Sequence, residues 1–166
     1  MTQSTLSRLP EQQDNVDSAN DRTAFSLGAN TTLHHLGFVV ASISAVAEEF
    51  ARSISASWDG EIIHDPIQRV RVAFFFPANE RNPVFELVEP ASDASPVSSF
   101  LKKNRGGLHH VCYEIEDLDL GLQQARCTGW VIAADPAPAV AFGGRRIAWI
   151  FSKQRLLVEL LERRPK

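Results

Sequence analysis

The sequence predicts an α+β fold made of two copies of one βαβββ unit, which form paired curved mixed sheets around a central cavity. The main observation is an internal repeat, because LHHLGFVV at residues 33–40 returns as LHHVCYEI at residues 108–115, 75 positions later. Two further pairs of segments match: RVAFFF at 71–76 with RIAWIF at 146–151, and FELVE at 85–89 with VELLE at 158–162. Self-similarity at a nearly fixed offset identifies a duplicated structural unit.

The composition is that of an ordinary globular protein. The chain has 166 residues, of which 44% are hydrophobic and 22% charged. A net charge of −3 gives no basis for expecting nucleic acid or an anionic membrane as a partner. The sequence contains no apolar run long enough to cross a membrane. Its N-terminus lacks the basic segment and apolar stretch of a secretion signal, so we expect a cytoplasmic protein.

The chain before the repeat differs from the rest. Residues 1–30 are rich in Gln, Asn, Asp, Ser and Thr, which predicts a disordered tail. The domain follows, at 31–166, and its first unit is residues 31–90. Apolar residues recur at helical spacing from Ile43 to Ile54, and Ser42 or Ser44 is expected to cap this helix. The strands of this unit are expected at 33–40, 61–64, 69–76 and 84–88.

Residues 91–107 are expected to connect the two units through a short helix that has Pro96 in its first turn. The second unit, 108–163, repeats the order of the first. Asp117 is expected to open its helix, which ends near Gly129. Its strands are expected at 108–115, 130–133, 145–151 and 156–161, and the Pro- and Gly-rich residues 136–144 are expected to form a loop.

Side chains alternate across a strand, which sorts the histidines of the repeat. His35 and His110 are expected to face away from the helices, whereas His34 and His109 point toward the helices or lie where the strands begin. Glu86 and Glu159 lie inside apolar runs. A buried carboxylate is unfavourable unless it is paired or bound to a metal.

These residues predict a metal site. A single histidine on a strand is usually a hydrogen-bonded core residue, and a single glutamate usually faces solvent, but four such residues at duplicated positions are hard to explain separately. We expect His35, Glu86, His110 and Glu159 to converge on one cation. Two imidazoles and two carboxylates suit a divalent cobalt, nickel, manganese, zinc or iron ion, with positions left for substrate or water.

With this arrangement, residues 33–163 resemble the vicinal oxygen chelate superfamily, which includes glyoxalase I, extradiol dioxygenases and antibiotic-resistance proteins. The local match is strongest to its methylmalonyl-CoA epimerases, in GLHH at 107–110, EIED at 114–117, GGRRI at 143–147 and FELVEP at 85–90. The resemblance implies a glyoxalase-like fold, a homodimer and metal ligands at His35, Glu86, His110 and Glu159. It also implies an isomerase that abstracts a proton next to a carbonyl of a small-molecule substrate, such as an acyl-CoA thioester.

The sequence departs from that family at the catalytic base. Some bacterial epimerases carry a glutamate on the third strand of the first unit, where this chain has Val72. Two residues remain as candidate bases. Glu159 would act as a displaceable metal ligand, and Glu114 lies on the inward-facing side of its strand.

Other interpretations remain open. Glyoxalase I (lactoylglutathione lyase) uses the same order of ligands, although residues 45–57 lack motifs typical of its first helix. A non-catalytic ligand-binding or resistance protein could share the fold, but such proteins often lose the metal residues. Arg145 and Arg146 could bind a phosphate or carboxylate, or serve a structural role duplicated at Arg71.

Overall fold

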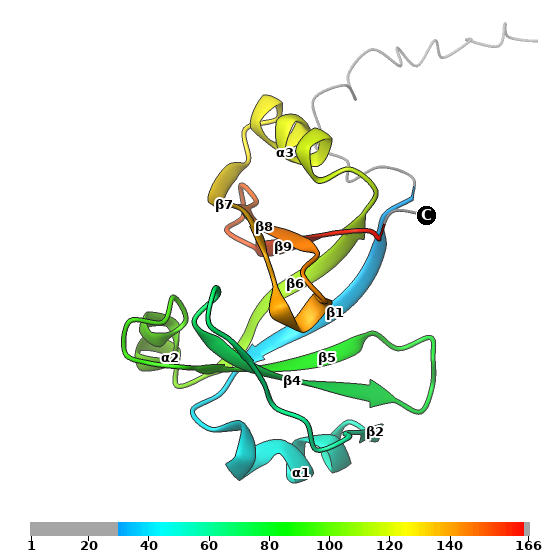
Figure 1. Ribbon diagram of the computed structural model, residues 1–166, viewed down its shortest axis with the longest axis vertical. Helices are drawn as coiled ribbons and strands as arrows, with labels where there is room; N and C mark the ends of the chain where they lie inside the picture. Colours follow the sequence, from blue (N-terminus) through cyan, green and yellow to red (C-terminus); the bar gives the residue numbers. More distant parts are fainter. Residues whose placement is uncertain (1–29, 165–166) are drawn as a thin grey trace, which may run out of the picture.

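A mixed sheet of nine strands passes through the whole computed structural model, which describes residues 30–164 (Figure 1). The strands lie in the order β2-β4-β5-β1-β6-β9-β8-β7, and β3 pairs with the remaining part of β4. The elements are β1 (Thr32–Val39), α1 (Ile43–Ser53), β2 (Ala56–Ser57), β3 (Ile63–Asp65), β4 (Val70–Pro77), β5 (Val84–Pro90), α2 (Ser98–Asn104), β6 (Gly107–Ile115), α3 (Leu118–Cys127), β7 (Val131–Pro138), the 3-10 helix η1 (Val140–Phe142), β8 (Arg146–Phe151) and β9 (Leu157–Glu162).

The two repeated units are joined through their first strands. Within each unit the first and last strands are parallel neighbours, β1 with β5 and β6 with β9. Between the units, β1 and β6 pair antiparallel. The predicted α+β architecture of two related units is therefore confirmed, and the β1–β6 pair makes one continuous sheet of them.

The helices α1 and α3 cover the outer faces of the two halves of the sheet. Figure 1 shows them at opposite ends of the molecule, with the strands between them. Under α1, the buried Ile43 packs in one cluster with Phe75 and Leu87. Under α3, Leu118 and Leu122 pack in an equivalent cluster. Burying an apolar side chain of this size contributes about 1.5–3 kcal/mol, so these clusters hold the helices outside and leave the inner face free.

The two helices begin differently. Asp117 caps α3 as predicted, because its carboxylate accepts a hydrogen bond of 2.9 Å from the Leu120 amide. Ser42 occupies the N-cap position of α1, as one of the two predicted residues, but its side chain makes no capping hydrogen bond. Instead, Glu89 Oε2 from β5 accepts from the Ile43 amide at 2.8 Å. A carboxylate from a distant strand thus satisfies a first-turn amide that has no partner within the helix.

An ion pair is duplicated with the units. Arg71 pairs with Glu89, and Arg146 pairs with Glu162 at 2.5 Å, in each case between the last two strands of a unit. Arg146 also reaches Asp119 at 3.0 Å. The alternative in which Arg146 repeats the structural role of Arg71 is therefore confirmed.

The second half departs from expectation at residues 136–144, which were predicted to be a loop. Strand β7 continues to Pro138, and η1 follows it. Because β7 is an edge strand with two irregularities in its pairing, its prolines need not donate to a neighbour. Pro96 was also misplaced, since Val97 is the N-cap of α2 and Pro96 precedes it.

The predicted tail lies almost entirely in residues 1–29, outside the described part of the chain. Within residues 30–164, no helix is long and apolar enough to cross a membrane.

Candidate metal centre and active site

Four side chains meet at the centre of the sheet, one from each of its four middle strands. His35 Nε2 lies 3.0 Å from His110 Nε2. Glu86 Oε2 lies 3.3 Å from His35 Nε2 and 3.4 Å from His110 Nε2. Glu159 Oε2 lies 3.2 and 3.5 Å from the same two nitrogens. The structure therefore brings together all four residues for which the sequence predicted a shared site.

Strand order explains the convergence. The neighbours β5, β1, β6 and β9 each contribute one residue, and the inward-facing positions of these strands lie on one face. Gly37 on β1 lies opposite His110 on β6. A Cβ atom at Gly37 would lie only 2.0 Å from His110 Cε1, so this glycine makes room for the imidazole.

The four side chains are buried, and each is at most 5% exposed. Burial alone would lower the pKa of His35, but attraction to the Glu86 and Glu159 carboxylates outweighs it and raises the pKa to about 10. Burial also lowers the pKa of His110, but hydrogen bonds and attraction to Glu159 and Glu86 outweigh it and raise the pKa. The facing imidazoles lower the pKa of both carboxyls despite their burial. The imidazoles and carboxylates of the cluster thus favour each other's charged forms.

The donor atoms fit a divalent first-row cation. Neighbouring ligands about 2.1 Å from such an ion and at right angles would be about 3.0 Å apart, close to the spacings found here. Glu159 Oε2 is buried and accepts no well-aligned hydrogen bond from residues 30–164. A buried carboxylate oxygen without a donor is expected where a cation binds.

His34 and His109 also contact this centre, contrary to the prediction that they point toward the helices or lie at the strand entries. His34 Nδ1 lies 2.9 Å from His35 Nδ1, and His109 Nδ1 lies 3.1 Å from His110 Nδ1. Burial and the neighbouring His110 lower the pKa of His109 to about 4, and burial and His35 lower that of His34. Both are therefore neutral near pH 7.

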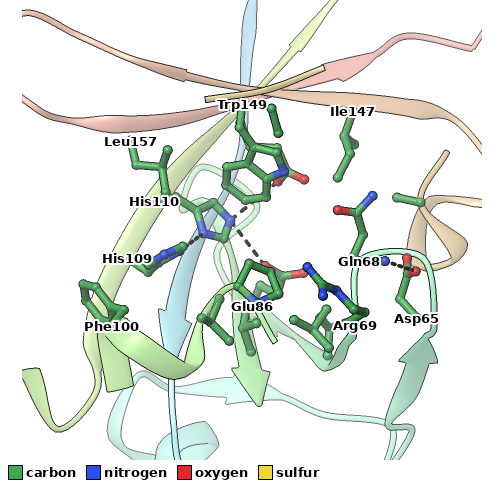
Figure 2. Close-up of a pocket in the computed structure, with 18 of the residues that line it drawn as sticks. Asp65, Gln68, Arg69, Glu86, Phe100, His109, His110, Ile147, Trp149 and Leu157 are labelled. Carbon is green, nitrogen blue, oxygen red and sulfur yellow. Dashed lines mark hydrogen bonds and ion pairs between the residues drawn. The ribbon is translucent and has the colours of Figure 1, made fainter. Parts of the chain in front are cut away.

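The centre lies at a cavity of about 710 Å³. Figure 2 shows Trp149 beside His110, Glu86 below His110, and Arg69 projecting into the cavity from the other side. Val72, the residue that replaces a carboxylate of some epimerases, is on the cavity wall and 3% exposed. The polar or charged residues that line the cavity beyond the centre are Asp65, Gln68, Arg69, Ser99, Lys103, Asn104 and His109.

The turn between β3 and β4 is fixed by Asp65, which is 1% exposed. Its carboxylate accepts from the Ile67 and Gln68 amides at 2.9 Å and from the Val140 amide at 2.7 Å. Arg69 follows in the left-handed region, with φ 57°. Its carbonyl accepts from the Ala91 amide at 3.2 Å, but its guanidinium forms no hydrogen bond or ion pair within the described chain. Sequence reasoning missed both residues, because the repeat gives no signal in this turn.

Glu114 lies elsewhere, although it was a candidate base. Its carboxylate pairs with Arg145 at 2.5 Å and with Arg163 at 3.4 Å, and it does not line the cavity. Arg145 is likewise engaged, so it does not offer a free cation to an anionic ligand.

Cys112 lies in the centre between the units, but burial and Glu159 raise the pKa of its thiol, which disfavours the thiolate that a metal would need.

Comparison with known proteins places this chain in one family. The model of the glyoxalase/bleomycin resistance protein/dioxygenase superfamily matches residues 15–149. The ethylmalonyl-CoA/methylmalonyl-CoA epimerase of Cereibacter sphaeroides is 29% identical over 131 residues, which cover 77% of this chain and 95% of that protein. The mitochondrial methylmalonyl-CoA epimerase of Bos taurus is 32% identical over 95 residues, 57% of this chain and 52% of that protein. The match thus spans about half of the bovine relative.

Solved structures share the fold. A hypothetical protein from Bacillus halodurans superposes with a TM-score of 0.72 at 26% identity, over 82% of this chain and 97% of that chain. The methylmalonyl-CoA epimerase of Mycobacterium tuberculosis superposes with a TM-score of 0.65 at 24% identity, over 80% of this chain and 88% of that chain. An epimerase from Streptomyces coelicolor that holds 2-nitronate-propionyl-CoA has a TM-score of 0.67 at 23% identity, over 80% and 97%.

Proposed function

We propose that this chain, which belongs to the glyoxalase/bleomycin resistance protein/dioxygenase superfamily, is a divalent-metal-dependent epimerase of an acyl-CoA thioester. The observation that carries the proposal is the convergence of four side chains at a cavity: the Nε2 atoms of His35 and His110 lie 3.0 Å apart, and an oxygen of Glu86 and one of Glu159 each lie 3.2–3.5 Å from both nitrogens. The similarity to the Cereibacter sphaeroides epimerase supports this choice of reaction.

The four residues would hold the metal through two imidazole nitrogens and two carboxylate oxygens. A bound divalent cation supplies Lewis-acid stabilisation of the negative charge that develops on the substrate's carbonyl oxygen when the α-proton leaves. The residues around it keep the reacting carbon away from water, because the cavity wall near the centre is formed by Val72, Val88 and Trp149.

Glu159 is the proposed base. Its carboxylate is ionised and buried and lacks a well-aligned hydrogen bond within the described chain, so as a displaceable metal ligand it would accept the α-proton. Glu114 is less suited, because two arginines hold it outside the cavity. In the first unit the wall carries Val72, so this chain has no carboxylate at that position to serve the second face of the α-carbon.

The cavity suits a thioester with a charged end. Apolar side chains form most of its wall, while Arg69 and Lys103 bring positive charge to it from the β3–β4 turn and from α2. Free guanidinium and ammonium groups can bind the carboxylate or phosphates of such a ligand. That the enzyme is a homodimer and acts in the cytoplasm remain predictions from the sequence.

The test is exchange of the α-proton of methylmalonyl-CoA in heavy water, with metal-loaded protein beside His110→Ala. We expect deuterium at the α-carbon with the wild type, and no exchange after metal removal or in the variant. The variant's folding is checked by its thermal unfolding, so that lost activity is assigned to the centre.

Two results would contradict the proposal in different ways. No exchange by a protein that still binds metal would exclude this substrate, and the hemithioacetal of glutathione would then test the alternative of a lactoylglutathione lyase. A protein that binds acyl-CoA but no divalent metal would indicate the non-catalytic ligand-binding alternative.

A further inference from the structure

Each proposed metal-binding histidine follows a second histidine, and both of these second histidines lie at β-bulges. On β1, the pairing with β6 passes from Leu33 to His35 while β6 advances by one residue, so His34 is the extra residue. On β6, the pairing skips His109 in the same way. A bulge redirects a side chain that strict alternation would place on the other face. Both members of each pair therefore meet on the side of the metal centre.

The ring nitrogens have complementary positions. His35 Nε2 and His110 Nε2 face each other across the centre at 3.0 Å, while the Nδ1 atoms of these rings point to His34 Nδ1 at 2.9 Å and His109 Nδ1 at 3.1 Å. A neutral imidazole that binds a metal through Nε2 carries its proton on Nδ1. That proton can be donated only to an unprotonated nitrogen. His34 and His109 must then accept through Nδ1 and carry their own protons on Nε2.

The accepting rings are themselves held in place. His34 lies edge-on to Phe142, with ring centroids 5.5 Å apart. His109 lies edge-on to Phe100 of α2 at 4.8 Å, and Figure 2 shows it between Phe100 and His110. Both rings are half-buried, so their orientation is set by packing before a metal binds.

We propose that His34 and His109 are positioning residues that accept hydrogen bonds from His35 and His110, and so fix the tautomer and the orientation in which these rings bind the metal through Nε2. The inference rests on the proposed metal centre and deepens it. Partners of this kind commonly govern metal affinity, and their loss weakens binding about 10–100-fold.

The experiment compares two replacements at each position in the full-length protein. Asparagine keeps an acceptor near the place of Nδ1, whereas leucine has a similar volume and no acceptor. Cobalt and zinc affinities are measured by competition with a chelator. We expect His34→Leu and His109→Leu to bind about 10–100-fold more weakly, and the asparagine variants to stay within about 3-fold of wild type. His64, an exposed histidine on β3, provides the control variant His64→Leu, which should bind as the wild type does.

A second readout reports the tautomers directly. Long-range proton–nitrogen NMR spectra of zinc-loaded, ¹⁵N-labelled protein should place protons on Nδ1 of His35 and His110 and on Nε2 of His34 and His109. Protons on the opposite nitrogens would overturn the inference. So would leucine variants with wild-type affinity, asparagine and leucine variants that are equally weak, or a wild type that binds no metal.

Failure of the proposed reaction would be recognised separately. Absence of α-proton exchange in the wild type and every variant would reject the epimerase activity, yet the ranking of metal affinities would still test the histidine pairs.

Discussion

Glu86 and Glu159 occupy matching places in the two units but differ in what surrounds them. Each contacts both imidazoles of the centre at 3.2–3.5 Å. Only Glu159 has a buried oxygen that lacks a well-aligned hydrogen-bond donor in the described chain. We therefore expect these equivalent carboxylates to act differently, with Glu159 moving the proton and Glu86 serving as a ligand.

This difference predicts unequal effects of the same substitution. Glu159→Gln should lower the rate of α-proton exchange about 10²–10⁴-fold at saturating metal, because an amide cannot accept the proton. Glu86→Gln removes the same charge at the same depth and serves as the matched variant. It should weaken metal binding but, once saturated, retain exchange within about 10-fold of wild type. Rates would be measured by mass spectrometry after incubation in heavy water.

Two outcomes would count against a base at Glu159. Equal losses in both variants would mean that the carboxylates act only as ligands. Full exchange in Glu159→Gln would move the base to another group.

The pairing of β1 with β6 positions the centre, because this pair joins the units and supplies both histidines of the proposed metal site. The pairing depends on a glycine. Gly37 is opposite His110, whose imidazole occupies the space in which a Cβ atom would lie. The position in β6 that matches Gly37 is Cys112. The two units therefore differ at the position where β1 packs against the imidazole of His110.

Gly37→Ala should therefore displace His110 from the centre. We expect metal affinity to fall at least about 10-fold, and the free energy of unfolding to fall by about 1–3 kcal/mol. The added methyl group would clash with the His110 ring, and both the ring and the β1 backbone are buried and have no room to move apart. Affinity would be measured by chelator competition and stability by urea unfolding.

The control for this substitution is Gly121→Ala, which adds the same methyl group in α3. There the new Cβ would meet the flexible end of Ile115 at 2.7 Å, and alanine favours a helix by about 1 kcal/mol over glycine. Metal affinity should be unchanged in this variant. An effect as large as that of Gly37→Ala would mean that any tightening of the core disturbs the metal centre.

The cavity lies between the two units, and few polar contacts tie them together across it. Asp65 provides one, because its buried carboxylate binds the Val140 amide of the second unit and two amides of its own turn. The turn that it fixes carries Arg69 over the cavity. A single carboxylate thereby links the contact between the two units to the position of Arg69 at the cavity.

Asp65→Ala should reduce the free energy of unfolding by about 2–4 kcal/mol, because three amides lose a charged acceptor in a buried place. Acyl-CoA affinity, measured by calorimetry, should fall as well. Asp59 forms a similar turn at the surface, where it accepts from the Glu61 amide at 2.9 Å, so Asp59→Ala is the matched control. Its loss should cost less than about 1 kcal/mol. Equal destabilisation by the two variants would show that Asp65 matters only to its own turn.

The sequence by itself determined the duplicated architecture and the identity of the four central residues. The repeat marked His35 with His110 and Glu86 with Glu159, and alternation along the strands placed His35 and His110 on the inner face. These inferences succeeded because periodicity and duplication are local properties that a sequence records directly.

Only the tertiary structure decided the rest, because it depends on contacts between distant strands. The bulges that turn His34 and His109 toward the centre arise from the pairing of β1 with β6, and alternation along one strand predicts the opposite. Alternation along β6 places Glu114 on the inward-facing side of the strand, as expected of a base. Two arginines from elsewhere in the chain nevertheless bind it outside the cavity. Arg69 and Asp65 lie in a turn without any repeat signal, and only the approach of the second unit gives them a place at the site.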